Sequence, residues 1–240
     1  MKKFTVGRAM LEIGEAAASI KSSLSNSWLM STISSDAKTK RFFWIEEIRK
    51  LSGSFSNDYE RLAESLAVEF RNHGPHSLID HLRLCGNIPE SYHHDSSEEK
   101  LYSKYTDILL ASCSTAIGLR SIVLTERSDA ADIEVFADDY SFVADAKAFR
   151  LSRTAKNQKD FKIQAMHSWK RGKPNAMVVC PIYQLPASSS QIYQNATGNN
   201  VCILTYSHLS LIAAYSQIDG NEKAQKLLYE IFNLVPQLPI

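Results

Sequence analysis

The sequence has only four cysteines in 240 residues, and no two of them are close together. They are Cys85, Cys113, Cys180 and Cys202. This spacing excludes the paired cysteines of a zinc site and the dense framework of a small disulfide-rich protein. Two of the four lie in apolar runs, so we predict four buried thiols.

A long hydrophobic run is also absent. No apolar stretch is long enough to cross a membrane, and Glu12 and Glu15 interrupt any signal-peptide core after the basic start. We therefore expect a cytoplasmic protein that does not bind a membrane. At 240 residues and 44% hydrophobic composition, the chain is long enough to bury a full core.

Nucleotide-binding motifs and internal repeats are missing as well. The chain contains neither a P-loop nor the glycine fingerprint of a dinucleotide site, which argues against those functions. Seven histidines are present, but His93–His94 and the group formed by His73, His76 and His81 lack cysteine or carboxylate partners at metal-site spacing. We predict that these histidines lie in loops or on helix surfaces.

The order of periodic segments predicts an α/β protein with two regions. Residues 1–96 show helical periodicity and form a helical N-terminal extension, and residues 97–240 form a core with a mixed central sheet flanked by helices. Helices are predicted over 3–21, 37–51, 57–72, 76–85, 98–119, 207–217 and 221–234, with strands over 121–125, 132–137, 140–148, 176–182 and 201–206.

The strand 140–148 carries an acid and a lysine on one face. Side chains alternate along a strand, so Asp145 and Lys147 point to one side, while Ala144, Ala146 and Ala148 point to the other and pack. An ordinary ion pair on a solvated strand would have the same spacing. A metal-dependent nuclease, however, arranges its carboxylate and lysine in this way.

A predicted β-hairpin gives Asp145 a partner. If Asp138 and Asp139 form a two-residue loop, Ala137 faces Tyr140 and the register places Asp132 opposite Asp145. Two carboxylates directly opposite each other raise one another's pKa, unless a cation lies between them. The hairpin therefore predicts a site for a hard divalent cation, Mg²⁺, whereas a slipped register would leave Asp132 as a solvated strand-end residue.

A strongly basic segment follows this hairpin. Residues 126–145 contain seven acids and one base, whereas residues 147–173 carry a net charge of +8 in a chain whose total is +1. This division suits a polyanion that is held while a metal acts on one phosphate. We predict a helix from near Ser152 or Thr154 to about 170, with its free N-terminal amides available to a phosphate. The alternative is a solvated helix with ordinary lysines.

Six residues in this segment are candidate DNA contacts. They are Arg150, Arg153, Lys156, Asn157, Lys159 and Lys162. Arginine and lysine can contact phosphates or guanine, and asparagine can read adenine in the major groove.

The run from Val143 to Lys162 closely resembles the core of the HindIII-type restriction endonucleases, members of the PD-(D/E)xK nuclease superfamily. Weaker similarity covers segments from Ser97 to Leu110, the Ala131–Asp132 pair, Gln191–Tyr193 and His208–Leu209. The family's usual proline is replaced here by Ala131, and the N-terminal extension looks unlike that of the relatives.

The resemblance implies a restriction-endonuclease-like fold and a type II enzyme. It assigns Asp132, Asp145 and Lys147 to catalysis. Asp132, Asp145, the Ala146 carbonyl and Glu99 would bind Mg²⁺. It also implies double-stranded DNA as the substrate, a homodimer that cuts a palindrome such as AAGCTT to leave 5'-phosphates, and a separate DNA methyltransferase in the same system that is not a bound partner. Two alternatives remain, a DNA-binding protein of this fold without cleavage activity and a purely structural helical protein.

Overall fold

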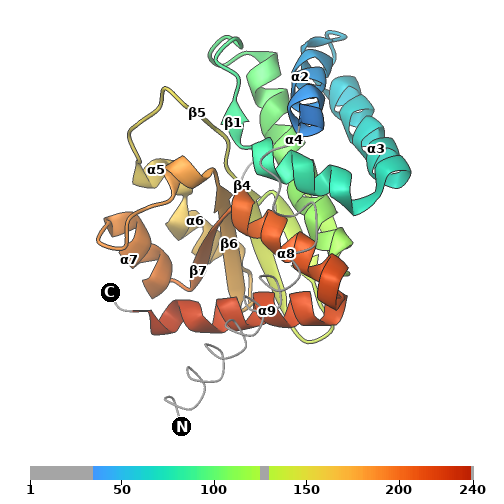
Figure 1. Cartoon of the computed structure of the whole chain (residues 1–240). Coiled ribbons are helices and arrows are strands. Elements are labelled where there is room, and N and C mark those ends of the chain that lie inside the picture. The colour runs from blue at the N-terminus through green and yellow to red at the C-terminus, as the bar shows by residue number, and fades with distance from the viewer. Residues whose placement is uncertain (1–34, 125–129, 239–240) are drawn as a thin grey trace.

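A computed structural model of the chain describes residues 35–124 and 130–238, and the predicted helix 3–21 lies outside them. Its centre is a five-stranded sheet of order β2-β3-β4-β6-β7 (Figure 1). The strands are β2 (Arg120–Val123), β3 (Ile133–Phe136), β4 (Ser141–Ala146), β6 (Asn175–Cys180) and β7 (Val201–Thr205). The first three pair antiparallel and the last three parallel, which confirms the expected mixed sheet.

Helices cover both faces of the sheet (Figure 1). On one side lie α2 (Ser35–Arg49), α3 (Phe55–Leu84), α4 (Ser97–Ala116), α8 (Tyr206–Asp219) and α9 (Asn221–Leu234). On the other side lie α5 (Gln158–Phe161), α6 (Ile163–Trp169) and α7 (Gln191–Gly198). Two short 3₁₀ turns, η2 (Ile182–Gln184) and η3 (Val235–Gln237), complete the described chain, together with a two-stranded parallel pair of β1 (Asn87–Ile88) and β5 (Phe149–Arg150).

Strand β4 separates the two hydrophobic clusters. Ala144 and Ala146 belong to the cluster beneath α4 and α8, whereas Val143 belongs to the cluster beneath α6 and α7. Ala148 packs against the first cluster. This confirms the predicted packing of the alanines on one face, which leaves the opposite face to Asp145 and Lys147.

The hairpin of β3 and β4 has the predicted register. Ile133 pairs with Ala144, and the Ala137 N–H donates to the Tyr140 carbonyl at 2.9 Å. Two exposed residues, Asp138 and Asp139, connect the strands. A two-residue connection fixes which residues face each other, so the turn sets the partner of Asp145.

The prediction of four buried thiols is also confirmed. Strand β6 runs parallel to β4, and all four cysteines are buried and free. Within residues 35–124 and 130–238, we find no helix with the length and apolar character needed to cross a membrane.

The helical region before α4 packs closely on the core. Helix α3 is interrupted at Gly74, whose φ of 69° lies in the left-handed region, and Pro75 follows it. This interruption agrees with the two predicted helices, 57–72 and 76–85. Leu62 and Leu66 share one hydrophobic cluster with side chains of β3 and β4. The proposed boundary near residue 96 stays a prediction.

His81 corrects the expectation that the histidines lie on the surface. It is buried, and its ring contacts the Tyr105 hydroxyl at 2.6 Å and Glu69 Oε1 at 3.1 Å. Burial lowers the pKa of His81. Burial alone would raise the pKa of Glu69, but hydrogen bonds from His81, Ser77 and Trp44 outweigh it and lower that pKa to about 2. The neutral imidazole therefore donates to Glu69 and accepts from Tyr105.

This arrangement predicts a pH-dependent stability. The His81 pKa is lower in the folded state than its ordinary value near 6.5, so the unfolded chain binds the extra proton as pH falls below about 6.5. His81 should therefore contribute a loss of up to about 1.4 kcal/mol of unfolding free energy per pH unit in the acidic part of the pH 7 to 5 range. Urea unfolding across this range checks it. His81→Gln should flatten the slope, while exposed His73→Gln should not; equal slopes in all three proteins would contradict the prediction.

Candidate active site

Two aspartates meet at the end of the β3–β4 hairpin. The register that pairs Ile133 with Ala144 places Asp132 opposite Asp145. A carboxylate oxygen of Asp132, Oδ2, accepts the Ala146 N–H at 3.0 Å, and its carbonyl accepts the Leu124 N–H at 2.8 Å. These bonds hold the Asp132 side chain against the end of β4, beside Asp145.

Lys147 lies next to this pair. Its Nζ forms an ion pair with Oδ2 of Asp145, whose side chain is only 3% exposed. No other group donates a hydrogen bond to that oxygen among the described residues.

Helix α4 adds a third carboxylate that the sequence analysis did not select. Asp107 is buried, and its Oδ2 accepts from Lys104 Nζ at 2.8 Å. In sequence the two residues look like an ordinary pair spaced i,i+3 on a helix surface. One sequence signal could have identified Asp107: it directly precedes the apolar run Ile108–Leu110, which indicates a buried stretch of the helix.

Burial and neighbouring negative charges raise the pKa of two of these carboxyl groups, Asp132 and Asp107. Burial raises the pKa of Asp132 well above its usual range, and the charges of Asp145 and Asp107 add to this effect. Burial likewise raises the pKa of Asp107 to about 6, with Asp145 contributing, although Lys104 acts in the opposite direction. Burial alone would lower the pKa of Lys104, but its attraction to Asp107 leaves it raised. Like charges are therefore held close together at this end of the sheet.

The donor set suits a hard divalent cation. Asp132 and Asp145 offer carboxylate oxygens, the ligands that such a cation prefers. Within the described ranges, however, no group of three or more histidine, cysteine, aspartate or glutamate side chains is already arranged as a metal cage. The ion pair with Lys147 holds Asp145 in this arrangement.

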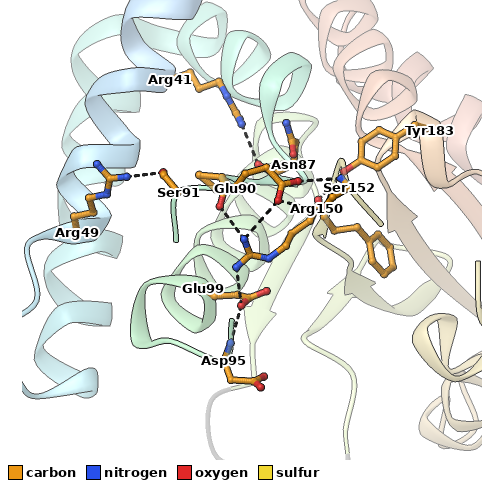
Figure 2. Close-up of polar contacts among 12 residues, drawn as sticks. Arg41, Arg49, Asn87, Glu90, Ser91, Asp95, Glu99, Arg150, Ser152 and Tyr183 are labelled. Atoms are coloured by element: carbon orange, nitrogen blue, oxygen red, sulfur yellow. Dashed lines mark hydrogen bonds and ion pairs between the residues drawn. The ribbon is translucent and has the colours of Figure 1, made fainter. Parts of the chain in front are cut away.

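Arg150 lies in β5, three residues after Lys147, and its side chain is not exposed as a DNA contact would be. Figure 2 shows its guanidinium between Glu90 and Glu99. One nitrogen, Nη2, donates to Glu99 Oε2 at 3.1 Å, and Nη1 donates to the Pro89 carbonyl at 3.3 Å. The residue is only 5% exposed. The Arg150 guanidinium is therefore already buried and paired. The predicted direct contact with DNA would require it to leave these partners.

The same network connects the helical region to β5 (Figure 2). Glu90 accepts from the Ser152 N–H at 2.9 Å and from the Ser152 hydroxyl at 3.1 Å. The backbone bond from Ser152 is the main cause that lowers the pKa of Glu90. Arg41 donates to the Asn87 carbonyl at 3.0 Å, in the strand that pairs with β5. The start of the basic segment is thus tied to residues 87–99.

Glu99 takes part in this network as a partner of Arg150. Its Oε2 also accepts the Asp95 N–H at 2.9 Å, and its own N–H donates to Ser96 at the start of α4. The charges that most affect the pKa of Asp132 are those of Asp145, Asp107 and two lysines, and Glu99 is not among them. The structure thus brings together Asp132, Asp145 and Lys147 as predicted, with Asp107 from the helix, and holds Glu99 by Arg150.

The predicted basic helix is wrong in its first half. Residues 151–157 form a turn followed by irregular structure, and regular helix begins only with α5 at Gln158. Neither Ser152 nor Thr154 caps a helix, because Asn157 is the residue before α5. Lys162 has a φ of 48° and separates α5 from α6. The first part of the segment is instead held by partners from elsewhere in the chain, because Ser152 donates to Glu90 and the Arg153 carbonyl accepts from Gln184 Nε2 at 2.6 Å.

The other five candidate DNA contacts lie between Arg153 and Lys162, and all of them are exposed. Arg153 pairs with Asp160 at 2.6 Å, and Lys156 donates to the Leu185 carbonyl at 2.8 Å. Lys162 lies over the Trp169 ring at 5.6 Å. Asn157 and Lys159 are exposed between them. The structure therefore presents these five side chains at the surface, unlike Arg150.

Comparison with known proteins identifies the family of this chain. The sequence profile of the HindIII restriction endonuclease family matches residues 42–239. The chain is 34% identical over 171 residues to the type II restriction enzyme HindIII of Haemophilus influenzae, an alignment that covers 70% of this chain. The aligned region spans 57% of that relative's length. The match over most of the chain, together with the mixed sheet and its paired aspartates, shows that the protein belongs to the HindIII restriction endonuclease family.

Proposed function

We propose that this protein is a type II restriction endonuclease that hydrolyses double-stranded DNA at a short palindrome. The observation that carries the proposal is the placement of Asp132 and Asp145 beside Lys147, directly before an exposed basic segment. Membership of the HindIII family supports it. AAGCTT is the first palindrome to test, because the relative in the comparison carries the name HindIII and the run from Val143 to Lys162 resembles that family.

The cofactor in this proposal is Mg²⁺, held by Asp132, Asp145 and the Ala146 carbonyl. When bound, Mg²⁺ supplies charge neutralisation at the phosphate and lowers the pKa of a coordinated water. Asp107 replaces Glu99 in our proposal as the helix acid, because its charge acts on Asp132 and Asp145 whereas Glu99 is engaged with Arg150.

Lys147 orients the attacking water and stabilises the hydroxide that forms. Its ammonium group lies beside the Asp145 carboxylate, so it is close to the oxygen atoms that surround the reacting phosphate. In-line attack by the water breaks the bond to the 3' oxygen of the preceding sugar. The products are a 5'-phosphate and a 3'-hydroxyl.

The exposed basic segment binds the DNA. Arg153, Lys156, Lys159 and Lys162 neutralise phosphates, and Asn157 is available to read a base edge. Binding should therefore weaken steeply as salt rises. A two-fold homodimer fits a palindromic site, since each protomer then reads one half-site. A methyltransferase that protects host DNA completes the system without binding this chain.

Binding without cleavage is the second candidate. The observation that favours it is the ion pair between Lys147 and Asp145, which engages a carboxylate oxygen that a metal ion would need. It predicts sequence-specific retardation of DNA on a gel without any cut product. The same protein preparation can therefore distinguish the two functions.

The direct test is incubation with unmethylated phage DNA, in Mg²⁺ and in EDTA. We expect discrete fragments in Mg²⁺ and none in EDTA. Lys147→Ala should lower the cleavage rate at least about 10²-fold, since it removes a charge used in the transition state, and should retain DNA affinity within about threefold. A control variant, Lys226→Ala on α9, should cleave normally. Unchanged cleavage by the Lys147 variant would contradict the site assignment.

A further inference from the structure

The main chain of Lys147 is fixed on both sides. Its N–H donates to the Val179 carbonyl at 2.7 Å, which extends the pairing of β4 with β6. Its carbonyl accepts a hydrogen bond from the Tyr206 hydroxyl at 3.1 Å. A residue that has left the regular strand therefore has both backbone polar groups satisfied, and one of the two partners is a side chain.

Tyr206 is itself held rigidly. It begins α8 directly after β7, where Thr205 and His208 form a capping box, and it is 2% exposed. Gly86 lies against its ring so closely that a Cβ at this position would come within 3 Å of two ring atoms. Gly86 has a φ of 82°, which glycine adopts without strain. The ring therefore has little freedom to move away from Lys147.

A second contact connects this tyrosine to the helix acid. Burial raises the pKa of Tyr206 well above its ordinary value, and a side-chain hydrogen bond with Thr106 acts in the opposite direction. Thr106 directly precedes Asp107 on α4. The hydroxyl of Tyr206 thus lies between the backbone of Lys147 and the turn of α4 that carries Asp107.

We propose that Tyr206 is a positioning residue that aims Lys147 at the reacting phosphate. Its hydroxyl fixes the Lys147 carbonyl, and so limits the directions that the lysine side chain can take from its Cα. A hydroxyl that only filled a buried polar position would stabilise the fold without affecting the chemical step. This inference rests on the proposed role of Lys147.

Tyr183 provides a matched control, because it bonds to the main chain two residues after Lys147. Its hydroxyl donates to the Phe149 carbonyl at 2.6 Å, so both tyrosines make one bond to a main-chain oxygen after β4. Phe149 belongs to β5, which leads to the basic segment. Tyr183→Phe removes an equivalent hydrogen bond without touching Lys147.

The test compares Tyr206→Phe, Tyr183→Phe and the wild-type protein on a duplex that contains one mapped cut site. We expect Tyr206→Phe to lower the single-turnover rate at saturating enzyme about tenfold, since small errors in position are costly to chemistry. Its dissociation constant for the duplex, measured in EDTA, should change less than twofold. Tyr183→Phe should keep the rate within about threefold. Amide exchange over residues 146–150 should be at least fivefold faster in Tyr206→Phe, with β6 unchanged.

Two results would overturn the inference. One is a Tyr206→Phe rate within twofold of wild type. The other is a rate that falls only in proportion to lost DNA binding or to unfolded protein. If the wild-type protein binds the duplex without cleaving it, the proposed function fails, and amide exchange alone then decides whether Tyr206 fixes the Lys147 backbone. Unchanged exchange in that case also overturns the inference.

Discussion

Replacing Asp145 with asparagine is expected to reduce DNA cleavage at least about 10²- to 10³-fold. Asparagine keeps the size of the side chain but removes the charge that would bind the cation and pair with Lys147. The loss should appear in the single-turnover rate, with DNA binding in EDTA retained.

The same change is expected to have only a small effect on the stability of the fold. Asp145 raises the pKa of Asp132, which means that the two carboxylates repel each other in the folded protein. Removing one charge relieves this repulsion but also takes the ion-pair partner from Lys147, so the two effects oppose each other and the free energy of unfolding should stay within about 1 kcal/mol of wild type. Urea unfolding measures this difference.

Asp139→Asn is the control for this substitution. Asp139 is exposed in the turn of the same hairpin and has no place among the carboxylates of the site. It should change neither cleavage nor stability. Cleavage by Asp145→Asn above a tenth of the wild-type rate, or destabilisation by more than about 2 kcal/mol, would show that Asp145 has a structural role instead.

The sequence was sufficient for the hairpin and its acids because the relevant physics is local. Asp138 and Asp139 form a short connection, and a two-residue loop fixes the register of both strands. The alternation of alanines with Asp145 and Lys147 then determines which side chains pack and which are displayed. These features depend on a few neighbouring residues, so they could be read before any tertiary contact was known.

The basic segment could not be predicted in the same way. Its charges suggested one helix, but β5 pairs with β1, more than 60 positions earlier in the chain. The charged partners of Arg150 are also distant in sequence, since Glu90 and Glu99 lie 60 and 51 positions before it. Asp107 and His81 were missed for a related reason, since a helix periodicity does not show which polar side chain is buried with partners from other helices.

Arg150→Met is expected to lower the stability of the fold, in contrast to substitutions of the exposed basic residues. Arg150→Met removes the guanidinium and leaves Glu99 and the Pro89 carbonyl without their partner. Breaking a buried ion pair from one side typically costs about 3 kcal/mol, and the partial exposure of Glu99 reduces this to about 2 kcal/mol. The melting temperature should then fall by about 4 to 8 °C, as measured by calorimetry.

Lys159→Ala is expected to have the opposite profile. Lys159 is exposed, so the free energy of unfolding should stay within about 0.5 kcal/mol of wild type. DNA affinity should weaken, and the slope of log affinity against log salt should fall by about 1, as expected for one lost phosphate contact. If Arg150→Met instead melted normally and lost discrimination between cognate and mismatched duplexes, the buried pair would have to open in the complex. Arg150 would then read a base, as its position in the sequence first suggested.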